Sequence, residues 1–169
     1  MNIVIRTWTK NDYKKLTDLC NSINRSYISD NIPFPYTVRD AKSFIDYVLS
    51  QDDSYALYRA IEFDKKLVGN ISIEKKQGLY EMDSEIGYVV DTNFWNQGIA
   101  TYAVSQLCTY AFDVMNITRI SGKVHKPNIA SQKVLKKNNF VLEGTLKNAI
   151  HKNGNLYDML LFAKYRTNF

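Results

Sequence analysis

A helical stripe between residues 104 and 115 is the strongest structural signal in this sequence. Its hydrophobic residues recur every three or four positions, as they do along one face of an α-helix. They are Val104, Leu107, Cys108, Ala111, Phe112 and Met115. Strand-like segments lie on both sides of this stripe, at 84–90 and 117–124. A helix between two strands indicates a sheet with helices packed against it.

The remaining segments extend this order toward both ends of the chain. Further strands are predicted at 3–8, 55–63, 67–75, 140–150 and 156–165. Two helices are predicted behind capping boxes at 9–12 and 37–40, and a short helix at 128–138. Turns at 64–66 and 152–155 each join two strands. Because some connections are hairpins and others are helices, the predicted fold is α/β (α+β) with a mixed sheet.

The predicted strand 67–75 alternates between apolar and polar side chains. One face is expected to carry Leu67, Ile71 and Ile73. The opposite face is expected to carry Asn70, Ser72 and Glu74.

Length and composition fit one domain that spans residues 1–169. Hydrophobic residues make up 45% of the chain and charged residues 23%. No apolar run approaches the roughly 20 residues that span a membrane. The segment 1–10 alternates like a strand and lacks the apolar core of a signal peptide. We therefore expect a cytoplasmic protein that does not enter a membrane.

The net charge and the cysteine content limit which partners, disulfides and metal sites are expected. The net charge of +5 suits an anionic partner such as a phosphorylated cofactor, RNA or a ribosome, and equally suits a mildly basic surface. The basic residues are scattered, so direct nucleic-acid binding is not expected. Cys20 and Cys108 lie on apolar helical faces and are expected in the core. With two cysteines and the distant His125 and His151, neither a disulfide nor a metal site is expected.

The segment Trp95-Asn96-Gln97-Gly98-Ile99-Ala100-Thr101 connects a predicted strand to the helix described first. The N-terminus of a helix carries unpaired N–H groups and a partial positive charge, so it binds phosphate. Gly98 permits close approach of the backbone to a ligand, and the small side chain of Ala100 does not obstruct that ligand. The Lys-Ser/Thr pair of a Walker loop and the repeated glycines of a dinucleotide fingerprint are missing. On its own, the loop is compatible with two interpretations, a phosphate-binding site and an ordinary turn between a strand and a helix.

The same loop resembles the acetyl-CoA signature of the GNAT N-acetyltransferase superfamily, Arg/Gln-x-x-Gly-x-Gly/Ala. Gly98 and Ala100 match its second and third fixed positions, whereas Trp95 stands where Arg or Gln is usual. The aromatic form of the loop resembles the RimJ/RimL-type branch, which contains ribosomal-protein alanine N-acetyltransferases. Further matches follow in order along nearly the whole chain, at Pro35-Tyr36-Thr37, Glu85-Ile86-Gly87-Tyr88, Asn128-Ile129-Ala130-Ser131 and 140–144.

The resemblance implies a three-layer fold, with a central, mixed, mostly antiparallel, twisted sheet of about seven strands flanked by about four helices. It also implies that acetyl-CoA is the cofactor. The strand 85–91 is expected to splay from its neighbour, so that the backbone of Val89 and Val90 pairs with the pantetheine arm. The pyrophosphate is expected on the N–H groups of Gln97, Gly98, Ile99, Ala100 and Thr101.

Acetyl transfer to an amine requires a deprotonated amine, a polarised thioester and a stabilised thiolate. Glu85 is the candidate base, directly or through water. The alternative is that Glu85 is a structural strand carboxylate paired with a backbone group or a basic neighbour. Many superfamily members use a tyrosine for the leaving group, where this chain has Leu135. Ser131 is the candidate acid, as in the RimL-type proposal. Asn128 is expected to cap the helix and to contact the cofactor.

The acceptor pocket is expected between the loop 25–36 and the closing hairpin. Its candidate lining residues are Phe34, Tyr36, Asn70, Tyr88 and His151. His125 is expected in a loop rather than as a base. Asn139 replaces the glycine that is usual in the family and is expected to form a left-handed helix cap.

The favoured reaction is acetylation of a protein N-terminal α-amine, of the ribosomal-protein type, by direct transfer in a ternary complex. An α-amine titrates about 2 to 3 units below a lysine amine, so a weak base suffices. The alternative acceptor is a small-molecule amine such as a polyamine, an aminoglycoside or an amino acid. A non-catalytic acyl-CoA- or RNA-binding module is an alternative of another class, because Leu135 has no proton to give. A homodimer is compatible with the family.

Overall fold

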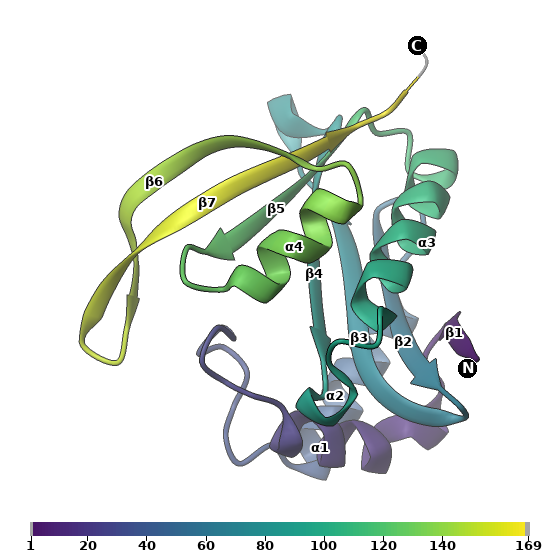
Figure 1. Cartoon of the computed structure of the whole chain (residues 1–169). Helices are drawn as coiled ribbons and strands as arrows, with labels where there is room; N and C mark the ends of the chain where they lie inside the picture. The colour runs from purple at the N-terminus through teal and green to yellow at the C-terminus, as the bar shows by residue number, and fades with distance from the viewer. Residues whose placement is uncertain (1, 168–169) are drawn as a thin grey trace.

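A seven-stranded sheet with helices on both faces dominates the computed structural model, which describes residues 2–167 (Figure 1). Its strands are β1 (Ile3–Arg6), β2 (Ala56–Phe63), β3 (Lys66–Lys75), β4 (Asp83–Val90), β5 (Arg119–His125), β6 (Val141–Lys152) and β7 (Asn155–Tyr165). Its helices are α1 (Tyr13–Ser22), α2 (Val38–Leu49), α3 (Ile99–Val114) and α4 (Ile129–Lys137). Short 3-10 turns are η1 (Lys10–Asp12), η2 (Gly78–Tyr80) and η3 (Thr92–Phe94). The predicted order of strands and helices and the predicted fold class are confirmed.

The sheet is antiparallel except where β4 meets β5. The strand order is β1-β2-β3-β4-β5-β7-β6. The parallel strands β4 and β5 pair only between 83–85 and 119–121. Beyond this point the two strands diverge (Figure 1), and within residues 2–167 no strand pairs with the β5 side of 86–90. The predicted splay of this strand is therefore confirmed.

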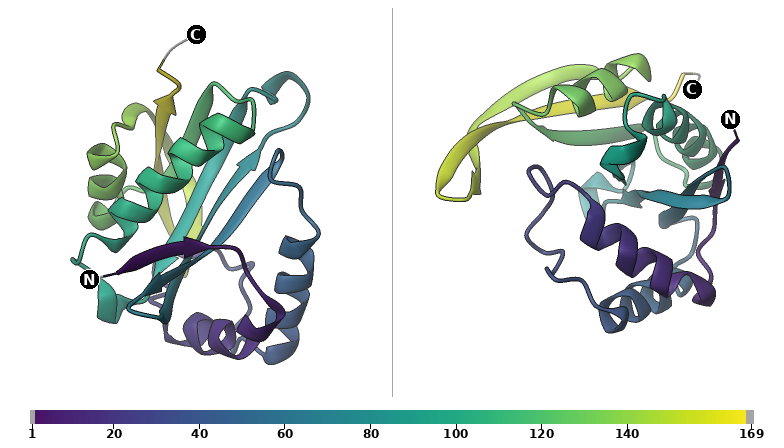
Figure 2. Two further views of the ribbon diagram at one scale, coloured as in Figure 1. Left: turned by 90° about the vertical axis from the view of Figure 1, so that its right-hand side faces the viewer. Right: turned by 60° about the horizontal axis from the view of Figure 1, so that its bottom comes forward.

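The helices cover the sheet in pairs, with α1 and α2 on one face and α3 and α4 on the other (Figure 2). The larger core lies beneath α3 and α4 and contains the predicted stripe of α3, including Cys108. The second core lies beneath α1 and α2 and contains Trp8, Leu16 and Cys20. Both cysteines are buried and free, as predicted. No helix among residues 2–167 has both the length and the apolarity needed to cross a membrane.

Side-chain caps fix where two of the helical segments begin. The N–H of Thr9 donates to Asp12 Oδ2 at 2.9 Å ahead of α1. The N–H of Thr37 donates to Asp40 Oδ2 at 2.8 Å ahead of α2. Both predicted capping boxes are present. Asn139 follows α4 with a φ of 63°, which is the left-handed cap that was predicted there.

A β-bulge in β3 changes the predicted side-chain alternation. The register between β2 and β3 skips Val68, which is the extra residue. Leu67 consequently packs into the second core, on the opposite face from Ile71 and Ile73. The prediction that these three share a face is wrong, because one extra residue reverses the direction of every side chain beyond it.

Candidate active site

The open edge of β4 presents backbone groups of Tyr88 and Val90 to the gap between β4 and β5. The N–H of Asp91 donates to the carbonyl of Val68 at 2.8 Å, on the β3 side. Backbone groups alternate in direction along a strand, so Val89 also faces β3 whereas Tyr88 and Val90 face the gap. The backbone of Val89, which was predicted to pair with the pantetheine arm, is thus directed toward β3, and the groups at the open edge are those of Tyr88 and Val90.

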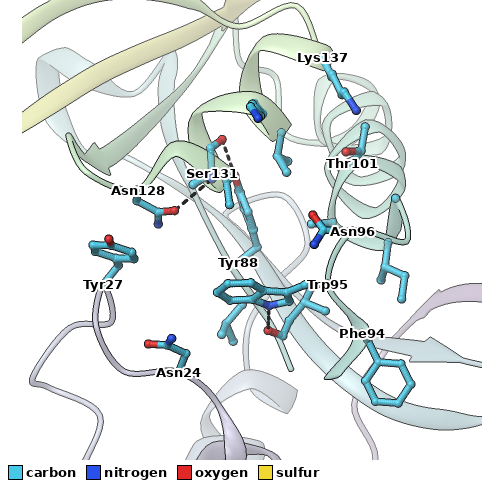
Figure 3. A pocket seen from close by; sticks show the side chains of 18 of the residues that line it. Asn24, Tyr27, Tyr88, Phe94, Trp95, Asn96, Thr101, Asn128, Ser131 and Lys137 are labelled. Atoms are coloured by element: carbon cyan, nitrogen blue, oxygen red, sulfur yellow. Dashed lines mark hydrogen bonds between the residues drawn. The ribbon is translucent and has the colours of Figure 1, made fainter. Parts of the chain in front are cut away.

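Trp95 holds the loop after β4 against this strand. Its Nε1–H donates to the carbonyl of Val90 at 2.7 Å (Figure 3). The indole also lines a cavity beside the gap. This contact occupies the carbonyl of Val90 and leaves its N–H, together with both backbone groups of Tyr88, directed into the gap.

The turn into α3 carries backbone N–H groups that have no intrahelical acceptor. Asn96 and Gly98 are left-handed, with φ values of 60° and 77°. Gly98 is the N-cap residue and offers no side chain to cap the helix. The N–H of Tyr102 donates to the carbonyl of Gly98 at 2.9 Å, so the three N–H groups between them have no intrahelical acceptor. They belong to Ile99, Ala100 and Thr101. An uncapped helix end of this kind binds an anion.

These groups open into a first cavity of about 310 Å³ between β4, α3 and α4. Among the described residues its lining includes Lys133 and Lys137 and no carboxylate. Figure 3 shows Lys137 reaching from α4 toward Thr101. Gln97 is the one predicted loop residue that does not line this cavity. Two lysines beside a helix N-terminus suit a polyphosphate ligand.

Tyr88 and Ser131 meet in this cavity (Figure 3). The phenolic oxygen of Tyr88 lies 2.8 Å from Ser131 Oγ and 3.3 Å from the Ser131 carbonyl oxygen. The N–H of Ser131 donates to Asn128 Oδ1 at 3.1 Å, so Asn128 caps α4. Burial raises the pKa of Tyr88 to about 12, although the hydrogen bond with Ser131 acts in the opposite direction. Tyr88 therefore keeps its proton at neutral pH.

Leu135 lies one turn further along α4 and is buried. It packs against Gly122 of β5, where an added Cβ would lie 3.0 Å from Leu135 Cδ1. A leucine has no proton to transfer. Tyr88 and Ser131 both present a hydroxyl group at this point of the gap.

A second cavity, of about 340 Å³, lies on the other side of the gap beneath the loop that joins α1 to α2. Asn70 and Ser72 of β3 line it, in agreement with the predicted alternation. Glu85 of β4 and Lys123 and His125 of β5 complete its polar wall. Glu85 Oε2 lies 2.7 Å from Lys123 Nζ. Within residues 2–167, Glu85 is the only carboxylate of this cavity.

The two cavities share six lining residues. These are Tyr27, Ile28, Tyr88, Val89, Asn128 and Ser131. Two molecules bound on opposite sides of the gap would therefore meet beside Tyr88 and Ser131.

Three predicted acceptor residues lie outside both cavities. The loop between α1 and α2 turns Phe34 toward solvent and buries Tyr36 in the second core, where it is 8% exposed. His151 is exposed on β6. Only Asn70 and Tyr88 of the predicted set line the second cavity. The loop conformation decides the outcome for Phe34 and Tyr36, and a loop leaves no periodic pattern in the sequence.

Sequence reasoning missed many of the lining residues, among them the polar or aromatic Tyr27, Lys123, His125, Lys133 and Lys137. The prediction that His125 lies in a loop is wrong, because β5 extends through it. Strand alternation places Lys123 and His125 on one face, and the i, i+4 spacing places the two α4 lysines together. These two patterns were present in the sequence, whereas nothing local indicated Tyr27.

This geometry defines a class of enzyme before any relative is considered. A phosphate-binding helix end lies beside an open strand edge, and a second cavity meets them from the other side. Such an arrangement suits a two-substrate transferase whose donor is long and phosphorylated.

The comparisons with known proteins give the family. Residues 2–141 match the model of the acetyltransferase (GNAT) domain. The chain is 29% identical over 163 residues to the uncharacterized N-acetyltransferase YnaD of Bacillus subtilis (strain 168), covering 95% of this chain and 92% of the relative. It is 28% identical over 145 residues to the ribosomal-protein-serine acetyltransferase of Escherichia coli (strain K12), covering 83% and 80%.

A solved structure supports the same fold. RimL, a ribosomal L7/L12 α-N-protein acetyltransferase in complex with coenzyme A, superposes with a TM-score of 0.86 at 22% identity, over 98% of this chain and 94% of that one. The chain therefore belongs to the GNAT acetyltransferase family. It is an N-acetyltransferase with acetyl-CoA as co-substrate, and the resemblance to the RimJ/RimL-type branch is confirmed. A non-catalytic binding module has no support among these relatives.

Proposed function

We propose that this enzyme acetylates a protein N-terminal α-amine by direct transfer from acetyl-CoA in a ternary complex. The main support for the proposal is that two cavities adjoin at Tyr88 and Ser131, which line both of them. A donor and an acceptor that enter from opposite sides of the gap can be bound at the same time. Holding both reactants in place removes much of the entropic barrier to their reaction.

Two properties of the first cavity suit acetyl-CoA, namely its positive charge and its path from the start of α3 to Ser131. Its pyrophosphate lies on the N–H groups of Ile99, Ala100 and Thr101, and Lys133 and Lys137 supply positive charge from α4. The pantetheine amides pair with the backbone of Tyr88 and with the N–H of Val90, which face the gap. This path brings the thioester to Ser131.

Ser131 acts on the departing sulfur. When the Tyr88 hydroxyl donates to Ser131 Oγ, the Ser131 hydroxyl is free to donate to the thiolate. The N-terminus of α4, capped by Asn128, adds a partial positive charge that favours the thiolate. General acid catalysis of this kind contributes about 10²–10⁴-fold to a rate.

The charge of the second cavity supports an α-amine over a polycation. Glu85 is its only carboxylate within residues 2–167, and Lys123 already pairs with it. A polyamine or an aminoglycoside carries several positive charges and requires several unpaired carboxylates. An α-amine carries one charge and has a pKa of about 8. The similarity to the ribosomal-protein-serine acetyltransferase favours the same acceptor.

The acceptor is tested by measuring thiol release and product mass with N-terminal peptides, polyamines and aminoglycosides. We expect the highest kcat/KM for peptides and the acetyl group on their α-nitrogen. The matched control is the same peptide with a formyl group on its α-nitrogen and a lysine retained, which is expected to be inert. A higher kcat/KM for a polyamine, or acetylation of that lysine, would contradict the proposal.

A further inference from the structure

His125 is the last residue of β5 and lines the second cavity beside Lys123. Tyr27 contacts the imidazole edge to face, with ring centroids 5.7 Å apart and an interplanar angle of 74°. Within residues 2–167 the imidazole makes no hydrogen bond and no ion pair. Its nitrogens are therefore free to meet a ligand in this cavity.

We propose that His125 is the general base that takes a proton from the ammonium group of the acceptor, an assignment that rests on the proposed transfer to an amine. The neutral nitrogen then attacks the carbonyl carbon of the thioester, so that a C–N bond forms and the C–S bond breaks. The sulfur leaves with the electron pair of that bond and takes a proton from Ser131. The second proton of the nitrogen, lost as the amide forms, restores the Ser131 hydroxyl, and the first leaves His125 for solvent.

Glu85 is the competing base, and its contacts argue against it. Its Oε2 lies 2.7 Å from Lys123 Nζ, so this oxygen is engaged before any acceptor arrives. Protonation of Glu85 would leave Lys123 without its partner. His125 carries no such contact and lines the same cavity. Glu85 and Lys123 thus form a fixed polar wall beside the base.

Burial and a neighbouring positive charge favour the neutral imidazole of His125. Burial, followed by the charge of Lys152 on β6, lowers the pKa of His125 below its ordinary value of 6.5. Lys152 Nζ is itself held near the cavity by Asp30 at 3.2 Å. Tyr27 contacts the ring from the loop, the Glu85–Lys123 pair lines the same cavity, and Lys126 follows His125 and pairs with Asp158 of β7. A neutral imidazole at pH 7 is ready to accept a proton.

The test is the pH dependence of kcat/KM for His125→Gln, with the amine that wild type acetylates best as acceptor. We expect kcat/KM to fall by about 10²–10⁴-fold. The decrease that wild type shows as pH falls through the His125 pKa should disappear, whereas the decrease set by the acceptor amine should remain. Binding of CoA, measured by calorimetry, should not change. Added imidazole should restore part of the activity of His125→Ala.

Two controls separate this role from a structural one. His151→Gln removes the other histidine of the chain from an exposed position on β6 and should keep the wild-type profile. Glu85→Gln should keep the decrease at low pH. The inference is overturned if His125→Gln keeps the wild-type profile, or if Glu85→Gln alone removes it. His125→Asn decides the matter if the glutamine variant does not fold. If wild type prefers a polyamine, the α-amine proposal is wrong. The comparison of the His125 and Glu85 variants still tests which residue is the base, because it uses the amine that wild type acetylates best.

Discussion

The phenolic oxygen of Tyr88 lies 2.8 Å from Ser131 Oγ, although the two residues are 43 positions apart in the sequence. Tyr88 comes from β4 and Ser131 from α4, which Asn128 caps. Both residues line both cavities. The pair therefore lies where, in the proposed function, the acetyl donor and its acceptor meet.

Ser131→Ala is expected to lower kcat by about 10²-fold or more, because it removes the proton donor to the thiolate. Tyr88→Phe should lower kcat by only about 2–12-fold, because it removes one hydrogen bond worth about 0.5–1.5 kcal/mol. The dissociation constant for CoA, measured by calorimetry, should stay the same in both variants. An unchanged kcat in Ser131→Ala at every pH would show that the acid assignment is wrong.

Lys133→Gln and Lys137→Gln should each raise the KM for acetyl-CoA by about fivefold, which corresponds to roughly 1 kcal/mol for an exposed charge pair. The kcat should not change, because the phosphates are bound equally in the ground state and the transition state. Lys136→Gln is the matched control, since Lys136 is exposed on the same helix and lines neither cavity. An equal rise in KM for Lys136→Gln would mean that only net charge matters.

Gly98→Ala and Gly154→Ala form a second matched pair, because both glycines have a φ of 77°. Each substitution should lower the free energy of unfolding by about 1 kcal/mol, since an L-residue is strained in this conformation. Only Gly98→Ala should also weaken CoA binding, because Gly98 lines the first cavity and Gly154 lies in the β6–β7 turn. Thermal melting and calorimetry check the two effects. Equal CoA affinity in the two variants would remove Gly98 from the phosphate site.

Most of the fold could be predicted from hydrophobic periodicity and from helix-capping residues. The stripe of α3, the two threonine capping boxes and the left-handed cap at Asn139 depend on neighbouring residues only, and all are present. The bulge at Val68 was missed because nothing in a regular alternation marks one extra residue.

The site was predicted in part. The resemblance directed attention to Ser131 and to the loop before α3, which the structure places at one cavity. Backbone direction along β4, which determines that Tyr88 faces the gap, needs the pairing partner and cannot be derived from side-chain types. His125 and Tyr27 come together from β5 and a distant loop, so only the tertiary fold reveals their contact.

Asp12 makes stability depend on pH. Burial of its side chain opposes ionisation, but hydrogen bonds from Arg6, at 2.8 and 2.9 Å, and from Thr9 lower the pKa of Asp12 below its ordinary value of 3.8. A carboxyl group with a lower pKa in the folded state stabilises the fold above its unfolded pKa, and this stabilisation is lost as pH falls. Asp12→Asn should therefore lower Tm at pH 7 and show a smaller further drop between about pH 5 and pH 3. An unchanged acid slope would contradict this role.

The most direct test of the central claim is the initial-velocity pattern with acetyl-CoA and an N-terminal peptide varied together. Direct transfer where the two cavities meet, at Tyr88 and Ser131, requires both substrates to be bound beforehand. Double-reciprocal plots should therefore intersect, and one CoA thiol should be released for each acetylated α-amine. Parallel lines would indicate a covalent acetyl-enzyme. That pattern, or the absence of thiol release with every amine, would contradict direct transfer across this gap.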